Sequence, residues 1–437
     1  MSQRRRVLIF AYFFPPRGGA GVQRIVKFAK YLPDEGWDPT IVTAKGDDYW
    51  MKDESLEREL AGRVPVVRTP AFTGLTIFSR LAPRQAGSGH SPRSSVGAVR
   101  RLRRISSWLL VPDSYVGWVP FARKAGEALL SREKFDALLT TSSPDSAHLI
   151  GLALSARARI PWAADFRDPW TRRLSFRPPT RWHRARQQAL EREVLRRAAL
   201  VTFTSDETRE DYARRYPDIP AAKMAVVTNG YDEEDFAHLE EAQPPASRFE
   251  ILHAGQLNPE RPALPFLLAL RSFLSAHPQA AGRVRARFIG PAYLGDLRAA
   301  EELGLSECVA FEPSRAHAGI VRAMRESHAL LLMEQGSEAG GLILPGKIFE
   351  YLRAGRPILG LLPEGAAWNL ITSLGAGKCC RADDREGCAR ALGELFQGFE
   401  RGLPPDSGVE RERILPFERR QTARRLANLL SSCLSDA

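Results

Sequence analysis

Short apolar stretches alternate with amphipathic stretches along nearly the whole chain, and this alternation most narrows the folds that are open to it. The apolar stretches have the length of buried strands, and the residues between them have helical spacing, as in Val22, Ile25, Val26, Ala29 and Leu32. Strands that alternate with helices predict parallel sheets covered by helices on both faces. The strands expected before residue 230 are 7–13, 37–43, 64–68, 135–140, 162–166, 200–204 and 223–227. Those expected after it are 250–254, 284–289, 308–311, 329–333, 357–361 and 378–381.

The alternation stops once, at residues 229–248, which are acidic and contain a Pro-Pro pair. A chain of 437 residues is also too long for one ordinary hydrophobic core. We therefore expect a first domain over 1–230, a linker over 231–248, a second domain over 249–415 and a terminal helix over 416–437 that crosses back to the first domain. Open parallel sheets bind ligands at the carboxyl ends of their strands, so we expect two doubly wound domains that face one cleft.

The segment LPGKIFEYLRAGRPIL, residues 344–359, carries the clearest chemical signal. A loop with Gly340, Gly341 and Gly346 leads into a predicted helix that bears Lys347 and Glu350 on one face. Free N–H groups at a helix start favour phosphate, and a carboxylate one turn later can accept hydrogen bonds from a vicinal diol. This spacing suits a nucleotide diphosphate. The alternative is an amphipathic helix whose Lys and Glu face water.

Five segments, taken in order, resemble the retaining glycosyltransferases of family 4, which have the two-domain GT-B fold. They are FPPRGGAGVQR (14–24), PWAADFRDPW (161–170), VVTNGYDEEDF (226–236), ILHAGQLNPERP (251–262) and PGKIFEYLRAGRPIL (345–359). The resemblance covers most of the chain. It implies transfer of a sugar from a nucleotide diphosphate to an acceptor hydroxyl, with retention of configuration and without a metal or other cofactor.

The resemblance also assigns residues to the sugar-nucleotide donor. It gives Glu350 to the ribose, and Lys347 and Arg261 to the diphosphate, with Gly346 at the start of the helix. The family's usual Arg and Lys pair is here reduced to Arg261, and the family's first glutamate is replaced by Leu342, so Glu338 is the candidate to take its place. Gly19 and Gly21 would let the backbone approach a phosphate or sugar closely.

The motif ADFRDPW supplies the catalytic candidates Asp165, Arg167 and Asp168. Where the family commonly has histidine, this chain has Arg167, which stays protonated and cannot act as a base. We expect Arg167 to orient substrate oxygens and Asp168 to contact the acceptor hydroxyl, because the resemblance implies that the leaving phosphate takes the acceptor proton. A buried structural Arg–Asp pair is the alternative.

The net charge of +12 indicates a surface that attracts phosphate. Residues 93–118 combine five arginines before the first acid with Trp108 and Trp118, and a second basic stretch, 172–197, contains Trp182. Such segments are typical of interfacial contact with anionic lipid, and a solvated cationic face is the alternative. No nucleic-acid-binding module is recognisable, so no nucleic-acid partner is expected.

The five cysteines match no zinc pattern, the histidines lie on separate elements, and no metal site is expected. Free thiols suggest a reducing cytoplasm. The sequence therefore predicts a cytoplasmic glycosyltransferase, peripheral on the inner face of the cell membrane, that acts on a lipid-linked or polysaccharide precursor. Two alternatives stay open: a nucleotide-sugar 2-epimerase-like enzyme, and a binding protein that kept the fold without catalysis.

Overall fold

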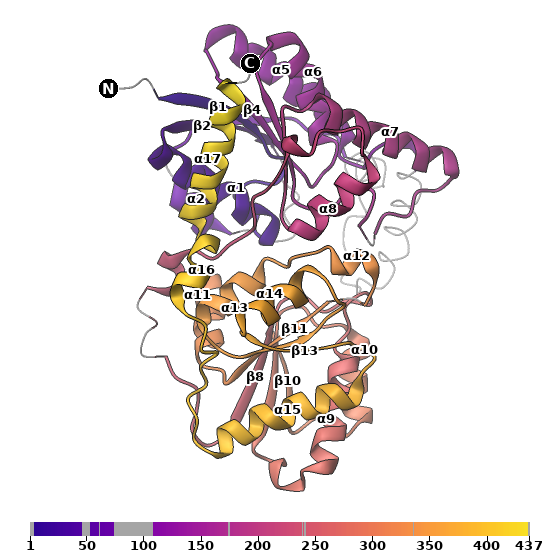
Figure 1. The fold of residues 1–437 in the computed structure, drawn as a ribbon, viewed down its shortest axis with the longest axis vertical. Coiled ribbons are helices and arrows are strands. Elements are labelled where there is room, and N and C mark those ends of the chain that lie inside the picture. Colours follow the sequence, from indigo (N-terminus) through magenta and orange to yellow (C-terminus); the bar gives the residue numbers. More distant parts are fainter. Residues whose placement is uncertain are drawn as a thin grey trace, which may run out of the picture. The chain divides into compact units, whose positions relative to one another are not determined.

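The structure is a computed structural model that describes residues 4–45, 53–60, 62–73, 108–173, 175–237, 239, 242–334 and 336–435. It divides into two compact units, which Figure 1 shows in sequence colours. Unit 1 comprises 1–227 and 423–437, and unit 2 comprises 228–422. The segment 231–248, which the sequence analysis treats as a linker, thus falls within unit 2. Of the basic segment 93–118, residues 93–107 lie outside the described ranges.

Unit 1 is built on a seven-stranded parallel sheet in the order β3-β2-β1-β4-β5-β6-β7. Its strands are β1 (Arg5–Phe10), β2 (Trp37–Ala44), β3 (Val66–Thr69), β4 (Ala137–Thr141), β5 (Trp162–Phe166), β6 (Leu200–Phe203) and β7 (Met224–Val226). Its helices are α1 (Ala20–Tyr31), α2 (Glu54–Leu60), α5 (Val119–Arg132), α6 (Ala147–Ala158), α7 (Arg181–Arg197) and α8 (Asp206–Arg215). Short 3-10 helices are η1 (Leu32–Glu35), η3 (Val116–Trp118) and η4 (Ala221–Lys223).

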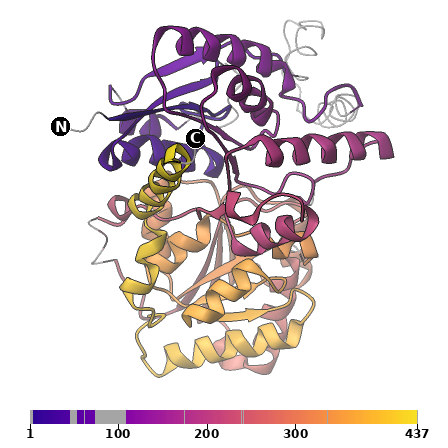
Figure 2. The ribbon, with the colours of Figure 1, turned by 45° about the horizontal axis from the view of Figure 1, so that its top comes forward.

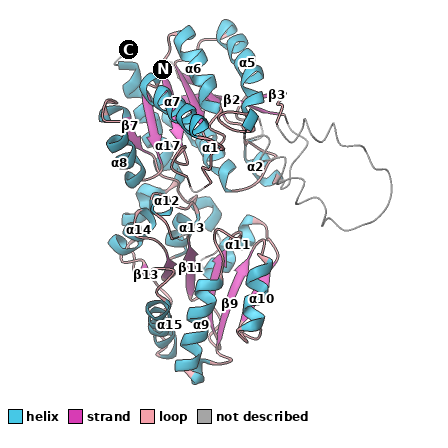
Figure 3. Cartoon of the chain, turned by 90° about the vertical axis from the view of Figure 1, so that its right-hand side faces the viewer, coloured by secondary structure: helices cyan, strands magenta, loops and turns pink. Residues whose placement is uncertain are grey.

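The central strands of unit 1 are apolar on both faces because helices cover both. Along β1, Val7 and Ile9 enter one buried cluster, whereas Leu8 and Phe10 enter the cluster on the other face. Successive side chains of a strand point to opposite faces, so continuous apolar strands indicate a doubly covered sheet. Figure 3 shows the strands of each unit between helices.

Unit 2 repeats this plan with a six-stranded parallel sheet in the order β10-β9-β8-β11-β12-β13. Its strands are β8 (Phe249–Ala254), β9 (Val284–Ile289), β10 (Val309–Glu312), β11 (Ala329–Met333), β12 (Ile358–Leu361) and β13 (Gly377–Cys380). Its helices are α9 (Leu264–Ala276), α10 (Leu294–Glu302), α11 (His317–Arg325), α12 (Glu338–Gly341), α13 (Lys347–Ala354), α14 (Ala366–Leu374), α15 (Arg385–Glu400) and α16 (Arg411–Ile414). Its 3-10 helices are η5 (Glu233–Phe236), η6 (Pro278–Ala280) and η7 (Leu415–Phe417).

The last helix, α17 (Arg419–Ser435), leaves unit 2 and joins unit 1 from residue 423 onward. Its apolar residues Ala423, Leu426 and Leu430 belong to a buried cluster of unit 1, and Ser431 Oγ lies 3.2 Å from the indole nitrogen of Trp37. Figure 2 shows this helix in yellow. Two doubly wound parallel sheets with a returning terminal helix confirm the predicted fold class.

Each sheet has one place where the chain reverses the direction in which it adds strands. In unit 1 this topological switch point lies between β1 and β4, and in unit 2 it lies between β8 and β11. Loops that leave neighbouring strands there diverge to opposite faces and open a crevice at the carboxyl ends, where open α/β sheets bind ligands. The residues that follow these four strands are therefore the first place to look for a site.

Candidate active site

In unit 2 the crevice holds a buried ammonium group without a partner. Lys347 is the first residue of α13, and within the described part of the chain its Nζ atom is buried and makes no hydrogen bond. The Nζ atom lies beside Gly255, which directly follows β8, and a Cβ atom built on that glycine would come within 2.8 Å of it. A larger residue at position 255 would displace the ammonium, so the glycine leaves room for it.

The guanidinium of Arg261 and the carboxylate of Glu334 lie in the same cluster. Arg261 Nη2 and Glu334 Oε2 are 3.1 Å apart, and Arg261 Nε is buried with no hydrogen-bond partner among the described residues. Burial raises the pKa of Glu334, and the nearby Arg261 and Lys347 oppose this. Burial, reinforced by Arg261, lowers the pKa of Lys347 to about 8. The two basic groups face the carboxylate of Glu334, and the charge of Glu350 also acts on Lys347.

His253 completes the lining of the cluster as a neutral side chain. Burial, with Lys347 nearby, holds the pKa of His253 well below its usual range. Its Nδ1 atom is 3.0 Å from the carbonyl oxygen of Leu331, to which a neutral imidazole donates its one N–H. A buried ammonium without a hydrogen-bond partner destabilises the folded state, and an anion that binds beside it would remove this destabilisation. This cluster is therefore built to accept an anion.

Glu350 lies one helical turn after Lys347 on α13. Its carboxylate is 16% exposed, and Oε1 lies 2.9 Å from His317 Nε2. The helix has Gly346 as its N-cap and ends at Gly355, which adopts the left-handed conformation at φ 71°. The predicted Lys and Glu are thus brought to one end of one helix, at the ligand-binding edge of the sheet.

Glu338 is the candidate to take the place of the family's first glutamate. It begins the short helix α12 and lines a pocket of about 550 Å³ together with Glu364 and Arg381. The carboxylate that pairs with Arg261 is Glu334, which the sequence analysis did not single out. Its signal was available, because Glu334 is the first residue after the buried strand β11.

In unit 1, Asp165 lies near the end of β5 and forms an ion pair in which both of its carboxylate oxygens accept hydrogen bonds. Arg24 donates to both of its oxygens, at 3.0 and 2.8 Å, and the hydroxyl groups of Thr141 and Thr202 donate at 2.8 and 2.7 Å. Arg24 and Asp165 are each 1% exposed. Burial by itself raises the pKa of Asp165, but Arg24 and the two hydroxyl groups outweigh it, and the pKa is lowered. Asp165 therefore lies in a buried ion pair with Arg24, a residue outside the ADFRDPW motif.

Arg167 and Asp168 lie beside the start of α1. Arg167 Nη1 donates to the carbonyl oxygen of Gly21 at 2.8 Å, and its Nη2 lies 3.1 Å from Asp168 Oδ2. A Cβ atom on Gly21 would come within 2.4 Å of Arg167 Nη1, so this glycine makes room for the guanidinium. Glycine is favoured at position 19 for a different reason. Gly19 is the N-cap of α1 at φ 105°, a conformation that other residues rarely adopt.

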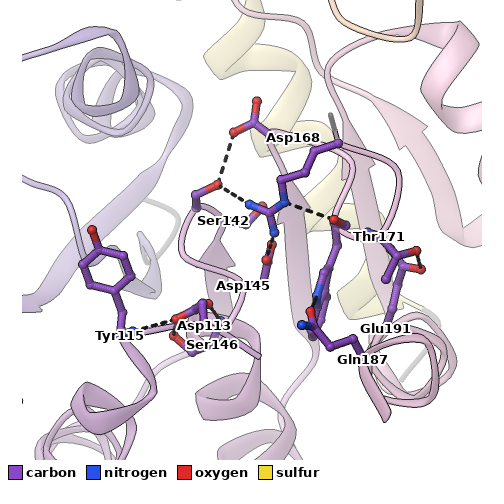
Figure 4. Close-up of polar contacts among 12 residues, drawn as sticks. Asp113, Tyr115, Ser142, Asp145, Ser146, Asp168, Thr171, Gln187 and Glu191 are labelled. Carbon is purple, nitrogen blue, oxygen red and sulfur yellow. Dashed lines mark hydrogen bonds and ion pairs between the residues drawn. The ribbon is translucent and has the colours of Figure 1, made fainter. Parts of the chain in front are cut away.

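A chain of polar contacts leads away from Asp168 across the loop after β4 (Figure 4). Ser143 Oγ donates to Asp168 Oδ2 at 3.2 Å and lies 3.4 Å from Arg173 Nη1, and Arg173 also pairs with the buried Asp145. The loop that carries Arg167 and Arg173 is anchored at Thr171, whose N–H and hydroxyl both donate to the buried Glu191. These contacts hold Asp168 just after the carboxyl end of β5, with its side chain 39% exposed.

No group of three or more His, Cys, Asp or Glu side chains suited to a metal ion occurs among the residues that the structure describes. The five cysteines are free thiols. No helix within the described ranges combines the length and the apolar character needed to cross a bilayer.

Comparison with known proteins gives one family and a set of similar structures. Residues 18–230 match the family described as glycosyl transferase 4-like domain. HepE of Anabaena, solved in complex with UDP and glucose, has a TM-score of 0.64 at 16% identity, over 98% of this chain and 100% of its own. The lipopolysaccharide outer core galactosyltransferase WaaB has a TM-score of 0.58 at 12% identity, over 98% and 99% of the two chains.

A third similar structure belongs to another reaction class. A Listeria monocytogenes protein assigned as a UDP-N-acetylglucosamine 2-epimerase has a TM-score of 0.56 at 10% identity, over 99% of this chain and 98% of its own. At these identities the three structures show a shared fold, which is GT-B. No curated protein matches the sequence.

Proposed function

The chain belongs, through residues 18–230, to the glycosyl transferase 4-like family, and from this premise we propose that unit 2 binds a nucleotide-diphosphate sugar and unit 1 the acceptor. It is a glycosyltransferase that depends on a nucleotide sugar. The observation that carries the donor assignment is the buried, unpartnered ammonium of Lys347 beside Arg261 at the switch point of unit 2. UDP is the first nucleotide to test, since HepE was solved with it.

In this proposal the donor diphosphate enters the Lys347–Arg261 cluster. Lys347 Nζ and the unpartnered Arg261 Nε supply N–H groups, and their charge stabilises the diphosphate as the glycosidic bond breaks. The carboxylate of Glu350 accepts the ribose hydroxyls. We propose Glu338, which lines a pocket with Glu364 and Arg381, as the residue that takes the place of the family's first glutamate.

In unit 1, Asp168 is the proposed contact for the acceptor hydroxyl, and Arg167 orients the substrate oxygens. Arg167 stays protonated, so it supplies charge and no base. We propose that the leaving phosphate takes the acceptor proton, that the sugar keeps its configuration, and that no metal takes part. Asp165 then acts by holding Arg24 in a buried ion pair.

The donor proposal is tested by thermal unfolding with UDP, GDP, ADP and dTDP. A ligand that binds only the native state raises the midpoint, by an amount set by its concentration relative to its Kd. We expect one diphosphate to stabilise the wild type and to lose this effect in Lys347→Met. The control is Lys378→Met, which removes a half-exposed lysine on β13 of the same unit. No stabilisation of the wild type by any diphosphate would contradict the proposal.

Product analysis separates the proposal from its rival. The fold is shared with the Listeria monocytogenes protein assigned as a 2-epimerase, and such an enzyme would change the sugar of its donor without any acceptor. A transferase releases the nucleoside diphosphate only as acceptor is consumed, apart from slow hydrolysis. Conversion of the nucleotide sugar into its 2-epimer in the absence of acceptor would favour the rival.

For the acceptor, we propose a lipid-linked or polysaccharide precursor at the inner face of the cell membrane, in the cytoplasm. The support is one face of unit 1, where Trp108, Leu109 and Trp182 are 51%, 75% and 64% exposed. His183 joins the two segments, because its Nε2 atom is 3.1 Å from the Trp108 carbonyl oxygen. No acidic residue occurs between Asp168 and Glu191, and the exposed arginines there are Arg177, Arg181, Arg184 and Arg186. We call these three apolar and four basic residues the α7 face.

Vesicle flotation tests the α7 face as a contact with anionic lipid. We expect binding to vesicles that contain phosphatidylglycerol and little binding to pure phosphatidylcholine. Arg181→Glu combined with Arg184→Glu should weaken binding roughly thirtyfold or more, because each basic residue near the surface contributes about 1 kcal/mol. The control is Arg390→Glu, an exposed arginine of unit 2. Equal flotation of the double variant and the wild type would contradict the proposal.

A further inference from the structure

The carboxylate of Glu350 is held from the side by an imidazole. His317 Nε2 lies 2.9 Å from Glu350 Oε1, and the two side chains are 25% and 16% exposed. His317 is the first residue of α11, which follows the carboxyl end of β10. The imidazole therefore contacts Glu350 from the start of a different helix, at the same ligand-binding edge of unit 2.

The other ring nitrogen of His317 faces a second carboxylate. His317 Nδ1 lies 3.8 Å from Asp235 Oδ2, on η5. The same 3-10 helix holds α13 directly, because Arg353 Nε donates to Glu233 Oε2 at 2.7 Å. Glu350 is thus fixed twice relative to η5: through the backbone of its own helix, and through the imidazole that contacts its side chain.

In this arrangement the carboxylate of Glu350 can still accept hydrogen bonds from a ligand. An ionised carboxylate has about four lone-pair sites, and the imidazole uses one of them, on Oε1. A vicinal diol needs two acceptors. A glutamate that is already held in one rotamer pays less entropy when it binds the diol than one that moves freely.

We propose that His317 is a positioning residue that orients Glu350 for the donor pentose and so sets the preference for ribose over 2′-deoxyribose. The inference rests on the proposed function, in which Glu350 accepts the ribose hydroxyls. A site built to bond a hydroxyl group rejects the analogue that lacks it, because its buried acceptor is left unpaired. The site no longer rejects the deoxy analogue when the acceptor side chain is free to turn away from the ligand.

Two substitutions of His317 separate its two ring nitrogens. The amide nitrogen of His317→Gln lies near the place of Nε2, whereas that of His317→Asn lies near Nδ1 and cannot reach Glu350. The probes are the diphosphate that stabilises the wild type most and its 2′-deoxy form. We expect His317→Asn to bind the ribonucleotide about tenfold more weakly and the deoxynucleotide unchanged, as for loss of one hydrogen bond to a charged group. His317→Gln should keep most of the ribose preference.

The controls separate this role from a purely structural one. His277→Asn changes another histidine of unit 2 and should leave the ratio of the two affinities at the wild-type value. In turnover, His317→Asn should raise the donor KM and leave kcat near the wild-type value. An unchanged affinity ratio in His317→Asn would overturn the role of His317 alone. Failure of the wild type to bind any diphosphate would instead remove the donor site and the proposed function with it. If His317→Asn does not fold, Asp235→Asn gives the second test, with a smaller loss of ribose preference expected.

Discussion

Lys347→Met is expected to weaken binding of the nucleotide diphosphate strongly and, at the same time, to stabilise the free protein. The ammonium is buried without a partner, and its burial lowers the pKa from 10.5 to about 8. Since the charged form is disfavoured in the folded state, removing it should raise the free energy of unfolding at pH 7 by roughly 1–3 kcal/mol. Loss of its contact with the diphosphate should weaken binding roughly a hundredfold. Thermal unfolding with and without the diphosphate measures both effects.

The same group makes donor binding depend on pH. The pKa of Lys347 is about 8 in the free protein, so the ammonium is largely protonated at pH 7 and loses its proton as the pH rises through 8. Diphosphate affinity should therefore fall above pH 8 in the wild type. The unfolded chain keeps its proton up to about pH 10.5, so this lysine's penalty to the free protein shrinks over the same range. A wild-type affinity that stays flat from pH 7 to pH 9.5 would contradict a direct contact between Lys347 and the diphosphate.

Asp165→Ala is expected to destabilise unit 1 by about 3–5 kcal/mol, because it removes the carboxylate that pairs with the buried charge of Arg24. Arg24 is 1% exposed, and it also donates to the carbonyl oxygen of Val227, at 2.9 Å. Urea unfolding measures the loss. The double variant Arg24→Met, Asp165→Ala should recover much of it, since it buries no charge.

The matched comparison for Asp165→Ala is Asp168→Ala, in the same sequence motif. Asp168 is 39% exposed, and its partners Arg167 and Ser143 remain accessible to water, so its removal should cost well under 1 kcal/mol. Its activity should nevertheless fall, because Asp168 is the proposed acceptor contact. A stability loss in Asp165→Ala no larger than that in Asp168→Ala would contradict the structural role of the Arg24–Asp165 pair.

The described strands lie where the apolar stretches predicted them because burial on both faces leaves little choice of residue. β5, β9 and β11 have the predicted bounds, and the other strands differ by a few residues at their ends. The helix with Lys347 and Glu350 was also predictable, because spacing along a helix is local and Gly355 ends it. These features depend on residues that are close together in the sequence.

The contacts that give the site its chemistry depend on residues far apart in the sequence, and these only the tertiary structure decided. Glu334 pairs with Arg261 because β8 and β11 are neighbours in the sheet, although 73 residues separate the two side chains. Arg24 reaches Asp165 from α1, and His317 reaches Glu350 from α11. The sequence by itself determined the two sheets, the helix α13 and the charge of the α7 face, since periodicity and composition are local properties of the sequence. The order of strands in each sheet brings distant loops together. It therefore decides whether a given Asp, Glu or Arg side chain forms a buried ion pair or stays available to a ligand.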